Sequence, residues 1–340
     1  MKVIQLTNWY HPQIGGVENH VKSISDGLHR IGCDVRIFTF TKSAERDAKT
    51  FRFLRIPSRY ECYSILPSPN LLTELLGSDA DVIHAHAYGY PMAWAAAFVR
   101  KARGTPFVYT THSDPYSRIY PLNDAGRLLP VKMCDLVIAT TKFEVEHLIE
   151  MGIDSSKIRL VPQGLAVGVA GPRPITEPYI LCLGRVNFGQ KGQDLLLRAY
   201  QAGKFHHKLV FAGDGTDLPK LRKLAAGNQN VIFLGAVYDD RKWAWLGNAD
   251  LVVMPSRTES YGQVAMEAMG MGRRLVVTKV GGLQKIAAPY AVLAEPNPVS
   301  LLEAMQIALE EDRQFGPVSL SAPSWQNVAE QTFKVYNEVI

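Results

Sequence analysis

Short runs of aliphatic and β-branched residues alternate with helix-like segments along the whole chain, in two successive series. The runs of the first series are Val3–Thr7, Asp34–Phe40, Asp81–His86, Phe107–Thr111, Leu136–Thr140 and Ile158–Pro162. The runs of the second series are Tyr179–Leu183, Lys208–Ala212, Val231–Leu234, Leu251–Met254, Leu275–Thr278 and Ala291–Ala294. Strands that alternate with helices are typical of parallel sheets joined by crossover helices. The pattern predicts an α/β protein with two Rossmann-like, doubly wound domains.

The length and the segment between the two series agree with two domains. At 340 residues the chain is too long for one ordinary core. Residues 166–174 contain two prolines and show no helical period, so we expect an interdomain linker there. The expected domains are therefore 1–165 and 175–323. The last segment, 324–340, has the pattern of an amphipathic helix.

Composition limits the compartment and the partners. The chain is 47% hydrophobic and 20% charged, as in soluble globular proteins. Its longest apolar stretch, Pro91–Val99, is far shorter than the roughly 20 residues that a bilayer requires, and no signal-peptide core follows Met1. We therefore expect a cytoplasmic protein. The net charge of +5 is mild, which argues against a nucleic-acid partner, and the four cysteines lack metal-ligand spacing.

One local stretch is strongly basic. From Lys42 to Arg59, basic residues far outnumber the two acidic ones, Glu45 and Asp47, and Phe51 lies among them. A solvated face is the first interpretation of such a run. The alternative is contact with an anionic membrane surface or with a charged acceptor, which would make the protein peripheral at the inner face of the cell membrane.

Two carboxylates follow the buried run Leu251–Met254. Glu259 lies in the next loop, and Glu267 lies in the helical segment after it. Ligands of open α/β sheets bind at the carboxyl ends of strands, and the N-terminus of the following helix favours a phosphate. Carboxylates beside an anion site can accept hydrogen bonds from sugar hydroxyls. Phosphate together with a polyol predicts a sugar nucleotide.

Glycines and cations occupy two other turns between an expected strand and a helix. Gly15 and Gly16 leave the backbone open to a phosphate, although a tight turn alone would also explain them. Arg185 and Lys191 stand at a helix start, where cations oppose the helix dipole, and a bound anion explains them better than solvent does. The sequence has no Asp-x-Asp pair, so no metal site is expected and these cations would stabilise the leaving phosphate.

These segments resemble the motifs of retaining glycosyltransferases of family GT4, which have the GT-B fold. The stretch Glu259–Glu267 matches the E-x7-E signature, G-G-V-E-N-H-V from Gly15 matches the glycine motif, and Gly184–Gly192 matches a G-R-x5-K-G element. The resemblance implies two domains that face a cleft. The first would bind the acceptor and the second the nucleotide sugar, with the C-terminal helix 324–340 packing back on the first.

The resemblance also implies individual roles. Glu259 would hold hydroxyls of the donor sugar and Glu267 the ribose, while His112, in T-T-H-S-D, would lie at the reaction centre. The expected catalytic residues are His112, Glu259, Arg185 and Lys191. The expected donor-binding residues are Gly15, Gly16, Gly184, Arg185, Lys191, Gly213, Val237, Glu259, Ser260, Tyr261, Gly262, Gln263 and Glu267. By contrast, His11 and His84 are expected to be structural, and His86 has only a weak claim to function.

We therefore expect a metal-independent, retaining hexosyltransferase without a cofactor. Its donor would be a UDP-, GDP- or ADP-sugar, and its acceptor a lipid-linked, glycan or small-molecule hydroxyl. The alternatives are a GT-B-fold sugar-nucleotide epimerase and a non-catalytic sugar-nucleotide-binding protein. A nicotinamide-dependent oxidoreductase is disfavoured because no G-x-G-x-x-G follows an expected strand. Arg274 and Lys285 depart from the family pattern, which leaves the sugar and the base open.

Overall fold

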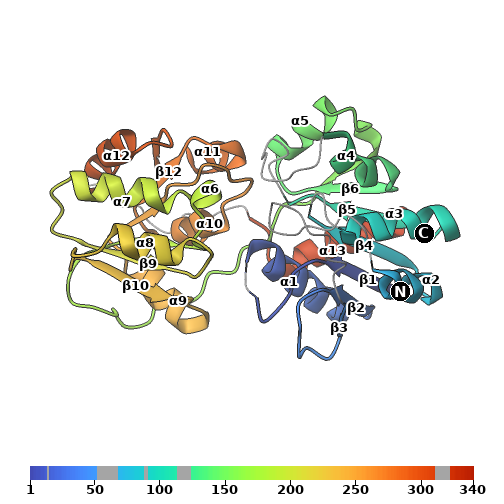
Figure 1. Cartoon of the computed structure of the whole chain (residues 1–340). Coiled ribbons are helices and arrows are strands. Elements are labelled where there is room, and N and C mark those ends of the chain that lie inside the picture. Colours follow the sequence, from blue (N-terminus) through green and yellow to red (C-terminus); the bar gives the residue numbers. More distant parts are fainter. Residues whose placement is uncertain (14, 52–67, 88–90, 113–123, 311–321) are drawn as a thin grey trace. The chain divides into compact units, whose positions relative to one another are not determined.

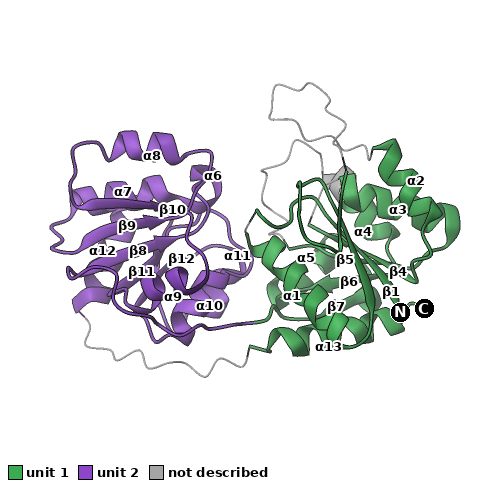
Figure 2. Cartoon of the chain, turned by 90° about the horizontal axis from the view of Figure 1, so that it is seen from below, with its two compact units in different colours: residues 1–164, 322–340 green, residues 165–321 purple. Residues whose placement is uncertain are grey.

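The chain forms two compact units, each built around a parallel sheet. The computed structural model describes residues 1–13, 15–51, 68–87, 91–112, 124–310 and 322–340. Unit 1 comprises residues 1–164 and 322–340, and unit 2 comprises residues 165–321 (Figure 2). Unit 1 is therefore assembled from two separate stretches of the chain.

Within the described residues, the sheet of unit 1 has seven strands in the order β3-β2-β1-β4-β5-β6-β7, all parallel (Figure 1). The strands are β1 (Lys2–Thr7), β2 (Asp34–Thr39), β3 (Ala48–Thr50), β4 (Val82–His86), β5 (Phe107–Thr110), β6 (Leu136–Ala139) and β7 (Ile158–Leu160). The helices are α1 (Gly16–Arg30), α2 (Pro69–Gly77), α3 (Pro91–Arg103), α4 (Asp124–Met133), α5 (Lys142–Glu150), the 3₁₀ turn η1 (Ser155–Lys157) and α13 (Trp325–Asn337). The strand order reverses between β1 and β4. In doubly wound sheets, ligands bind at the carboxyl ends of strands at this point.

The C-terminal helix α13 completes the core of unit 1. It lies against α1, where a side chain at Gly27 would place its Cβ 2.4 Å from the Cβ of Ala329 (Figure 1). At the start of α13, the Trp325 ring packs on Gly164, whose Cβ would lie 2.5 Å from it. Val328 and Tyr336 of α13 are fully buried in the same cluster as strand residues of the sheet.

Within the described residues, the sheet of unit 2 has six parallel strands in the order β10-β9-β8-β11-β12-β13. The strands are β8 (Tyr179–Leu183), β9 (Lys208–Ala212), β10 (Val231–Gly235), β11 (Leu251–Met254), β12 (Leu275–Thr278) and β13 (Val292–Ala294). The helices are α6 (Phe188–Lys191), α7 (Gln193–Ala202), α8 (Leu218–Leu224), α9 (Asp239–Gly247), α10 (Gln263–Gly270), α11 (Gly281–Ala287) and α12 (Pro298–Glu310). Here the order reverses between β8 and β11, so Gly184 and the loop from Pro255 leave the sheet at its switch point.

The segment expected to link the domains belongs to unit 2. Residues 165–174 form neither helix nor strand and pack on helices of that unit. The backbone at Gly168 packs directly on Trp243 of α9, since a Cβ at this position would be only 2.3 Å from the indole. At Gly270 of α10, a Cβ would be 2.7 Å from Val167. The boundary between the units therefore falls at Gly164, before this segment.

The structure differs from the sequence expectation at several strand ends and in one added strand. Strand β5 ends at Thr110, one residue before the expected end, and the hydroxyl of the next residue, Thr111, donates a hydrogen bond to Glu144. Within the basic run, residues 48–50 form the edge strand β3, and Lys49 pairs with Glu74 at 2.6 Å. Residues 52–59 of that run lie outside the described residues. Among the described helices, none is both long and apolar enough to cross a bilayer.

Candidate functional site

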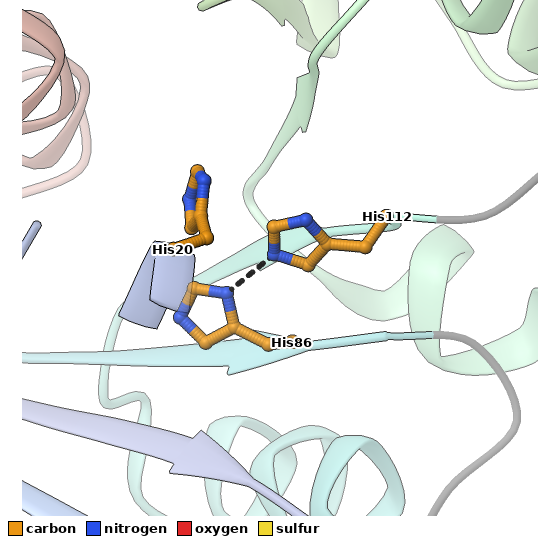
Figure 3. A group of neighbouring side chains, drawn as sticks. All are labelled: His20, His86 and His112. Carbon is orange, nitrogen blue, oxygen red and sulfur yellow. Dashed lines mark hydrogen bonds between the residues drawn. The ribbon is translucent and has the colours of Figure 1, made fainter. Parts of the chain in front are cut away.

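Three histidines meet at the carboxyl edge of the unit 1 sheet. His86 is the last residue of β4, His112 follows β5, and His20 comes from the second turn of α1. Figure 3 shows the three rings lying close together, with a hydrogen bond between His86 and His112. We call these three residues the histidine group. Only His112 among them was expected at the reaction centre.

A chain of hydrogen bonds extends from the histidine group into the core of unit 1. His86 Nδ1 lies 2.9 Å from His112 Nε2, and His86 Nε2 lies 2.7 Å from Oε1 of Gln5 on β1. Gln5 Nε2 donates to the hydroxyl of Tyr336 on α13 over 3.0 Å. The position of His112 is therefore coupled to β4, β1 and the C-terminal helix.

His84 extends this chain on the far side of Tyr336. Its Nδ1 lies 2.7 Å from the Tyr336 hydroxyl, and its Nε2 lies 2.7 Å from Oγ1 of Thr110. We call the six residues Thr110, His84, Tyr336, Gln5, His86 and His112 the histidine network. The structural role expected of His84 agrees with these two buried hydrogen bonds, whereas His86 directly contacts His112.

Burial keeps the histidines neutral. Desolvation lowers the pKa of His20 to about 3, and it holds the pKa values of His84, His86 and His112 well below the usual range. His20 is 2% exposed, and its Nδ1 has no hydrogen-bond partner among the described residues. Neutral imidazoles provide one donor and one acceptor nitrogen each, which suits hydrogen bonding to sugar hydroxyls.

The histidine group also has the composition of a metal site. The three nitrogens that it can offer lie within 4.8 Å of one another. Two nitrogens bound to one tetrahedral zinc ion at 2.0–2.1 Å would lie about 3.3–3.4 Å apart. The 2.9 Å between His86 Nδ1 and His112 Nε2 is a hydrogen-bond distance. The two rings therefore fit a hydrogen bond better than two bonds to one ion.

The backbone at this edge adopts conformations that side chains rarely favour. His112 has a φ of 53° and Ala87 a φ of 68°. Left-handed conformations cost a residue other than glycine roughly 1–2 kcal/mol and concentrate at functional sites. Hydrogen bonds hold the turn in place, since Ala87 N donates to Thr110 O and the Tyr109 hydroxyl donates to Ala87 O. The neighbouring strand β5 thus holds the turn at Ala87.

The expected phosphate turn of unit 1 is open. Gly15 is the N-cap of α1 in an extended conformation, and it makes no side-chain cap. Gly16, the first helical residue, is exposed, and no atom would lie within 4 Å of a Cβ there. The start of α1 therefore has neither a side-chain cap nor a crowding neighbour at Gly16, which suits the approach of an anion.

In unit 2, Glu259 forms an ion pair with Lys191. Lys191 ends α6, and Glu259 lies in the loop after β11. A Cβ at Gly192 would lie 2.0 Å from Pro255 O, so these two segments are in direct contact. The structure therefore brings together two of the expected catalytic residues.

A second set of contacts, which the sequence analysis missed, holds the same two segments. Arg257 N donates to Gln190 O over 2.8 Å, and the Arg257 guanidinium makes two hydrogen bonds, of 2.7 and 2.8 Å, to Asp194 of α7. Such bidentate pairs fix geometry as well as adding energy. In the sequence, only the position of Arg257 two residues before Glu259 could have indicated that it belongs to the site.

Glu267 is 2% exposed and has one partner. Its Oε1 accepts a hydrogen bond from Lys242 of α9 over 2.6 Å, whereas Oε2 is buried without a partner among the described residues. Burial raises the pKa of Glu267, and the charge of Lys242 opposes this shift. Lys242 was also missed, because nothing in its own segment distinguishes it from a solvated helical lysine.

The glycines of unit 2 allow close backbone approaches. Gly213 has a φ of 151°, and its Cβ would lie 1.9 Å from Gly184 O, so any side chain would separate the two turns. Gly262 has a φ of 77° and contacts Leu283 in the same way. It is the N-cap of α10 and, with no side-chain cap, leaves the N–H groups of that helix to other partners.

The other expected donor-binding residues surround these turns with different exposures. Arg185 is exposed just after β8, and Gln263 is the partly buried first residue of α10. Between Glu259 and Gly262, Ser260 is partly buried and Tyr261 is buried, which raises the pKa of Tyr261 to about 12. Val237 is buried in the loop between β10 and α9.

Two protein family models match the chain, one after the other. The model described as Glycosyltransferase Family 4 matches residues 14–167, and the model described as Glycosyl transferases group 1 matches residues 177–311. The two matches cover most of unit 1 and most of unit 2, respectively.

Individual proteins agree with these models. The chain is 25% identical over 378 residues to a phosphatidylinositol N-acetylglucosaminyltransferase subunit of Arabidopsis thaliana, covering 100% of this chain and 82% of that protein. It is 27% identical over 389 residues to the D-inositol 3-phosphate glycosyltransferase of Xylanimonas cellulosilytica, covering 95% and 91%. Among solved structures, Anabaena Alr3699/HepE in complex with UDP-glucose has a TM-score of 0.77 at 17% identity, covering 100% and 98%.

Both sheets, both family matches and the likeness over the full length agree on one assignment. The structural likeness, at this low identity, supports the fold, and the family models support the enzyme class. The chain belongs to the family 4 and group 1 glycosyltransferases, and it is a sugar-transferring enzyme with the GT-B fold.

Proposed function

We propose that the protein is a retaining, metal-independent glycosyltransferase that uses a nucleoside-diphosphate sugar. The observation that carries this proposal is the environment of Glu267. Its Oε1 is held by Lys242, while its buried Oε2 has no partner among the described residues. An unsatisfied buried acceptor is costly, and a ribose hydroxyl would supply the missing hydrogen bond.

In unit 2, the diphosphate would bind two cations and the N-terminus of α10. Arg185 and Lys191 offer positive charge, and the uncapped N-terminus of α10 offers N–H groups. Charge-assisted hydrogen bonds to the leaving phosphate strengthen as its negative charge grows, so they lower the barrier of transfer. In this proposal no metal ion is needed for the departing charge.

Glu259 would hold hydroxyls of the donor sugar while keeping its contact with Lys191. A carboxylate has more acceptor sites than one lysine occupies. The acceptor hydroxyl would attack the face from which the phosphate leaves, and the phosphate would take the proton of that hydroxyl. This path retains the configuration of the sugar. His112 would contact the reacting sugar.

The likeness to the Anabaena protein supports a UDP-sugar as the first donor to test, with GDP- and ADP-sugars next. For the acceptor, both relatives described above carry an inositol phosphate in their names. We therefore propose a hydroxyl of an inositol phosphate, free or lipid-linked, as the first acceptor to test. Other glycans and small molecules follow it.

A lipid-linked acceptor would require contact with a membrane. We propose that the basic run Lys42–Arg59 provides it, since each lysine or arginine near an anionic surface contributes about 1 kcal/mol. Co-sedimentation with phosphatidylserine vesicles tests this proposal. Binding that disappears when Arg52, Arg55 and Arg59 are changed to Ser would support it. Equal sedimentation of the variant would remove it.

Calorimetry with UDP and with UDP-glucose tests the assignment of the two glutamates. Glu267→Gln is expected to weaken the binding of both ligands. The neutral amide has no negative charge for Lys242, and only one of its two polar atoms can accept a hydrogen bond from the ribose hydroxyl. Glu259→Gln is expected to weaken only the UDP-sugar. The matched control is Glu295→Gln, which removes an exposed ion pair to Lys279 in the same unit. Equal weakening of UDP by both site variants would contradict the assignment.

Turnover assays separate the proposed reaction from its rivals. Transfer that continues in excess EDTA supports the metal-independent reaction, whereas loss of activity that magnesium or manganese restores would overturn it. Conversion of the nucleotide sugar without any acceptor would indicate an epimerase. NMR of the product sugar shows directly whether the configuration at the anomeric carbon is retained.

A further inference from the structure

We propose that Gln5 and Tyr336 are positioning residues that determine which ring nitrogen of His112 carries its proton. In this arrangement His112 Nε2 donates to His86, and His112 Nδ1 is an acceptor. The relevance to catalysis rests on the proposed role of His112, whereas the proton position itself does not.

The first step concerns the side-chain amide of Gln5. Its Oε1 lies 2.7 Å from His86 Nε2. A carbonyl oxygen can only accept a hydrogen bond, so His86 Nε2 must carry a proton. Burial of His86 disfavours the charged ring, so this is its only ring proton. His86 Nδ1 then has a lone pair and no proton.

The second step transfers this constraint to His112. Its Nε2 lies 2.9 Å from His86 Nδ1, and one of the two nitrogens must donate. Since His86 Nδ1 has no proton, His112 Nε2 carries it. A neutral His112 ring has one proton, and its Nδ1 is then an acceptor. If His86 Nδ1 carried the proton instead, His112 Nε2 would accept the hydrogen bond and His112 Nδ1 would be a donor.

The third step concerns the groups that couple to the Gln5 amide. Its Nε2 donates to the Tyr336 hydroxyl over 3.0 Å, and that hydroxyl can in turn donate to His84 Nδ1 over 2.7 Å. His84 Nε2 then donates to Thr110 Oγ1. Rotating the Gln5 amide by 180° would exchange its donor and acceptor. Every proton of the histidine network would then have to reverse together.

This coupling has a consequence for the ligand. A group that meets His112 Nδ1 must donate a hydrogen bond, and sugar and acceptor hydroxyls do so. A phosphate oxygen at neutral pH only accepts, so it is a poor partner for that nitrogen. The network thus selects a hydroxyl over a phosphate at this position of the reaction centre. Tyr336 takes part in this selection from the C-terminal helix.

Nitrogen-15 NMR of the full chain labelled at histidine tests the proposal, with the His112 signals assigned by their loss in His112→Ala. In the unsubstituted protein we expect a protonated Nε2 and an unprotonated Nδ1. In Gln5→Met the acceptor of His86 Nε2 is lost, and we expect His112 to show a mixture of both proton positions or the reverse one. The matched control is Gln326→Met, which removes an amide that accepts a hydrogen bond from Arg30 on the surface of unit 1.

Three results would overturn the proposal. They are a protonated Nδ1 of His112 in the unsubstituted protein, an unchanged His112 signal in folded Gln5→Met, and a stoichiometric metal bound to the histidine group. Should Gln5→Met not fold, Tyr336→Phe serves instead. It removes the hydroxyl that accepts the hydrogen bond of Gln5 Nε2, and it is expected to produce the same mixture of proton positions.

Kinetics then separates this proposal from the proposed function. We expect Gln5→Met to lower kcat at least tenfold while the dissociation constant of UDP stays within twofold, because Glu267, the proposed ribose contact, lies in unit 2. An unchanged kcat in a variant with reversed proton position would overturn the catalytic relevance of the network. Full activity of His112→Ala would instead contradict the role of His112, and the NMR result would stand by itself.

Discussion

Both units place chemical groups at the carboxyl edge of a parallel sheet, but the groups are of opposite character. In unit 1, neutral histidines are joined by hydrogen bonds, and burial suppresses their charge. In unit 2, glutamates form ion pairs with lysines, Glu259 with Lys191 and Glu267 with Lys242. The corresponding sheet edges therefore hold neutral polar groups in unit 1 and ion pairs in unit 2. The difference is whether each titratable group has a partner of opposite charge.

The difference separates the tasks of the two regions. A neutral network can sort donors from acceptors without attracting or repelling an anion. Paired charges can exchange partners with an incoming diphosphate and sugar, since a lysine and a carboxylate each have further bonding capacity. Acid should thus affect mainly unit 1, and loss of a lysine should affect mainly unit 2.

Acidification gives the largest expected difference between the units. An unfolded histidine gains a proton below a pKa of about 6.5, whereas folded His20 does so only near 3. Each histidine that stays neutral in the folded state therefore lowers the free energy of unfolding as the pH falls from 6.5 toward the folded pKa. At pH 5 the loss is roughly 2 kcal/mol per histidine. We expect hydrogen-exchange protection of β4 and β5 to fall more than that of β9 and β11 between pH 7 and pH 5.

One group in unit 1 works in the other direction. Burial raises the pKa of Glu144, so its protonation stabilises the folded state as the pH falls. It is a single carboxyl against four histidines whose pKa values are lowered, so a net loss of stability is still expected. Protection factors corrected for the intrinsic exchange rate measure the effect. An equal loss of hydrogen-exchange protection in the two sheets would contradict the expected difference between the units.

Removal of Lys191 is the next largest effect, and it should be confined to catalysis. Lys191→Met is expected to lower turnover by roughly 10- to 150-fold, because a charge-assisted hydrogen bond of about 1.5–3 kcal/mol is lost as the phosphate departs. Lys220→Met is the matched control, since Lys220 pairs with Asp217 on the surface of the same unit. Similar turnover in the two variants would show that the Lys191 pair is only structural.

Lys242→Met should have a smaller effect that depends on pH. Lys242 lowers the pKa of Glu267 against the effect of burial, so its loss raises that pKa further. A protonated Glu267 oxygen is a hydrogen-bond donor, so it cannot accept the hydrogen bond that the ribose hydroxyl would donate to it. We expect UDP affinity to fall by several-fold at pH 6 and to recover as the pH rises. A loss of affinity that is the same from pH 6 to pH 8 would contradict this explanation.

The sequence contained most of the fold because its signals are local. Strand runs and helix patterns predicted both sheets, and strands β8, β9, β11 and β12 begin and end at the expected residues. The short edge strand β3 was missed because residues 48–50 have no apolar run. The segment 166–174 was expected to be an interdomain linker. Its packing on Trp243 was not foreseen, because that packing depends on close approach at Gly168 and not on a hydrophobic pattern.

The candidate site was only partly visible for the same reason. Glycines and motif carboxylates can be recognised by their spacing, and Glu259 and Lys191 indeed meet. Lys242, Arg257 and Gln5 could not be recognised, because each acquires its role from a partner far away in the sequence. The roles proposed for the individual site residues stay predictions until the variants are measured.

The position of α13 has a consequence for biosynthesis. A ribosome releases residues 1–164 long before residues 322–340, so unit 1 cannot close its core while unit 2 is being made. Domains usually fold in the order of their synthesis, the N-terminal one first. Here unit 1 lacks α13 until residues 322–340 have been made. A nascent chain cut short after unit 2 would lack Tyr336 and would never assemble the histidine network.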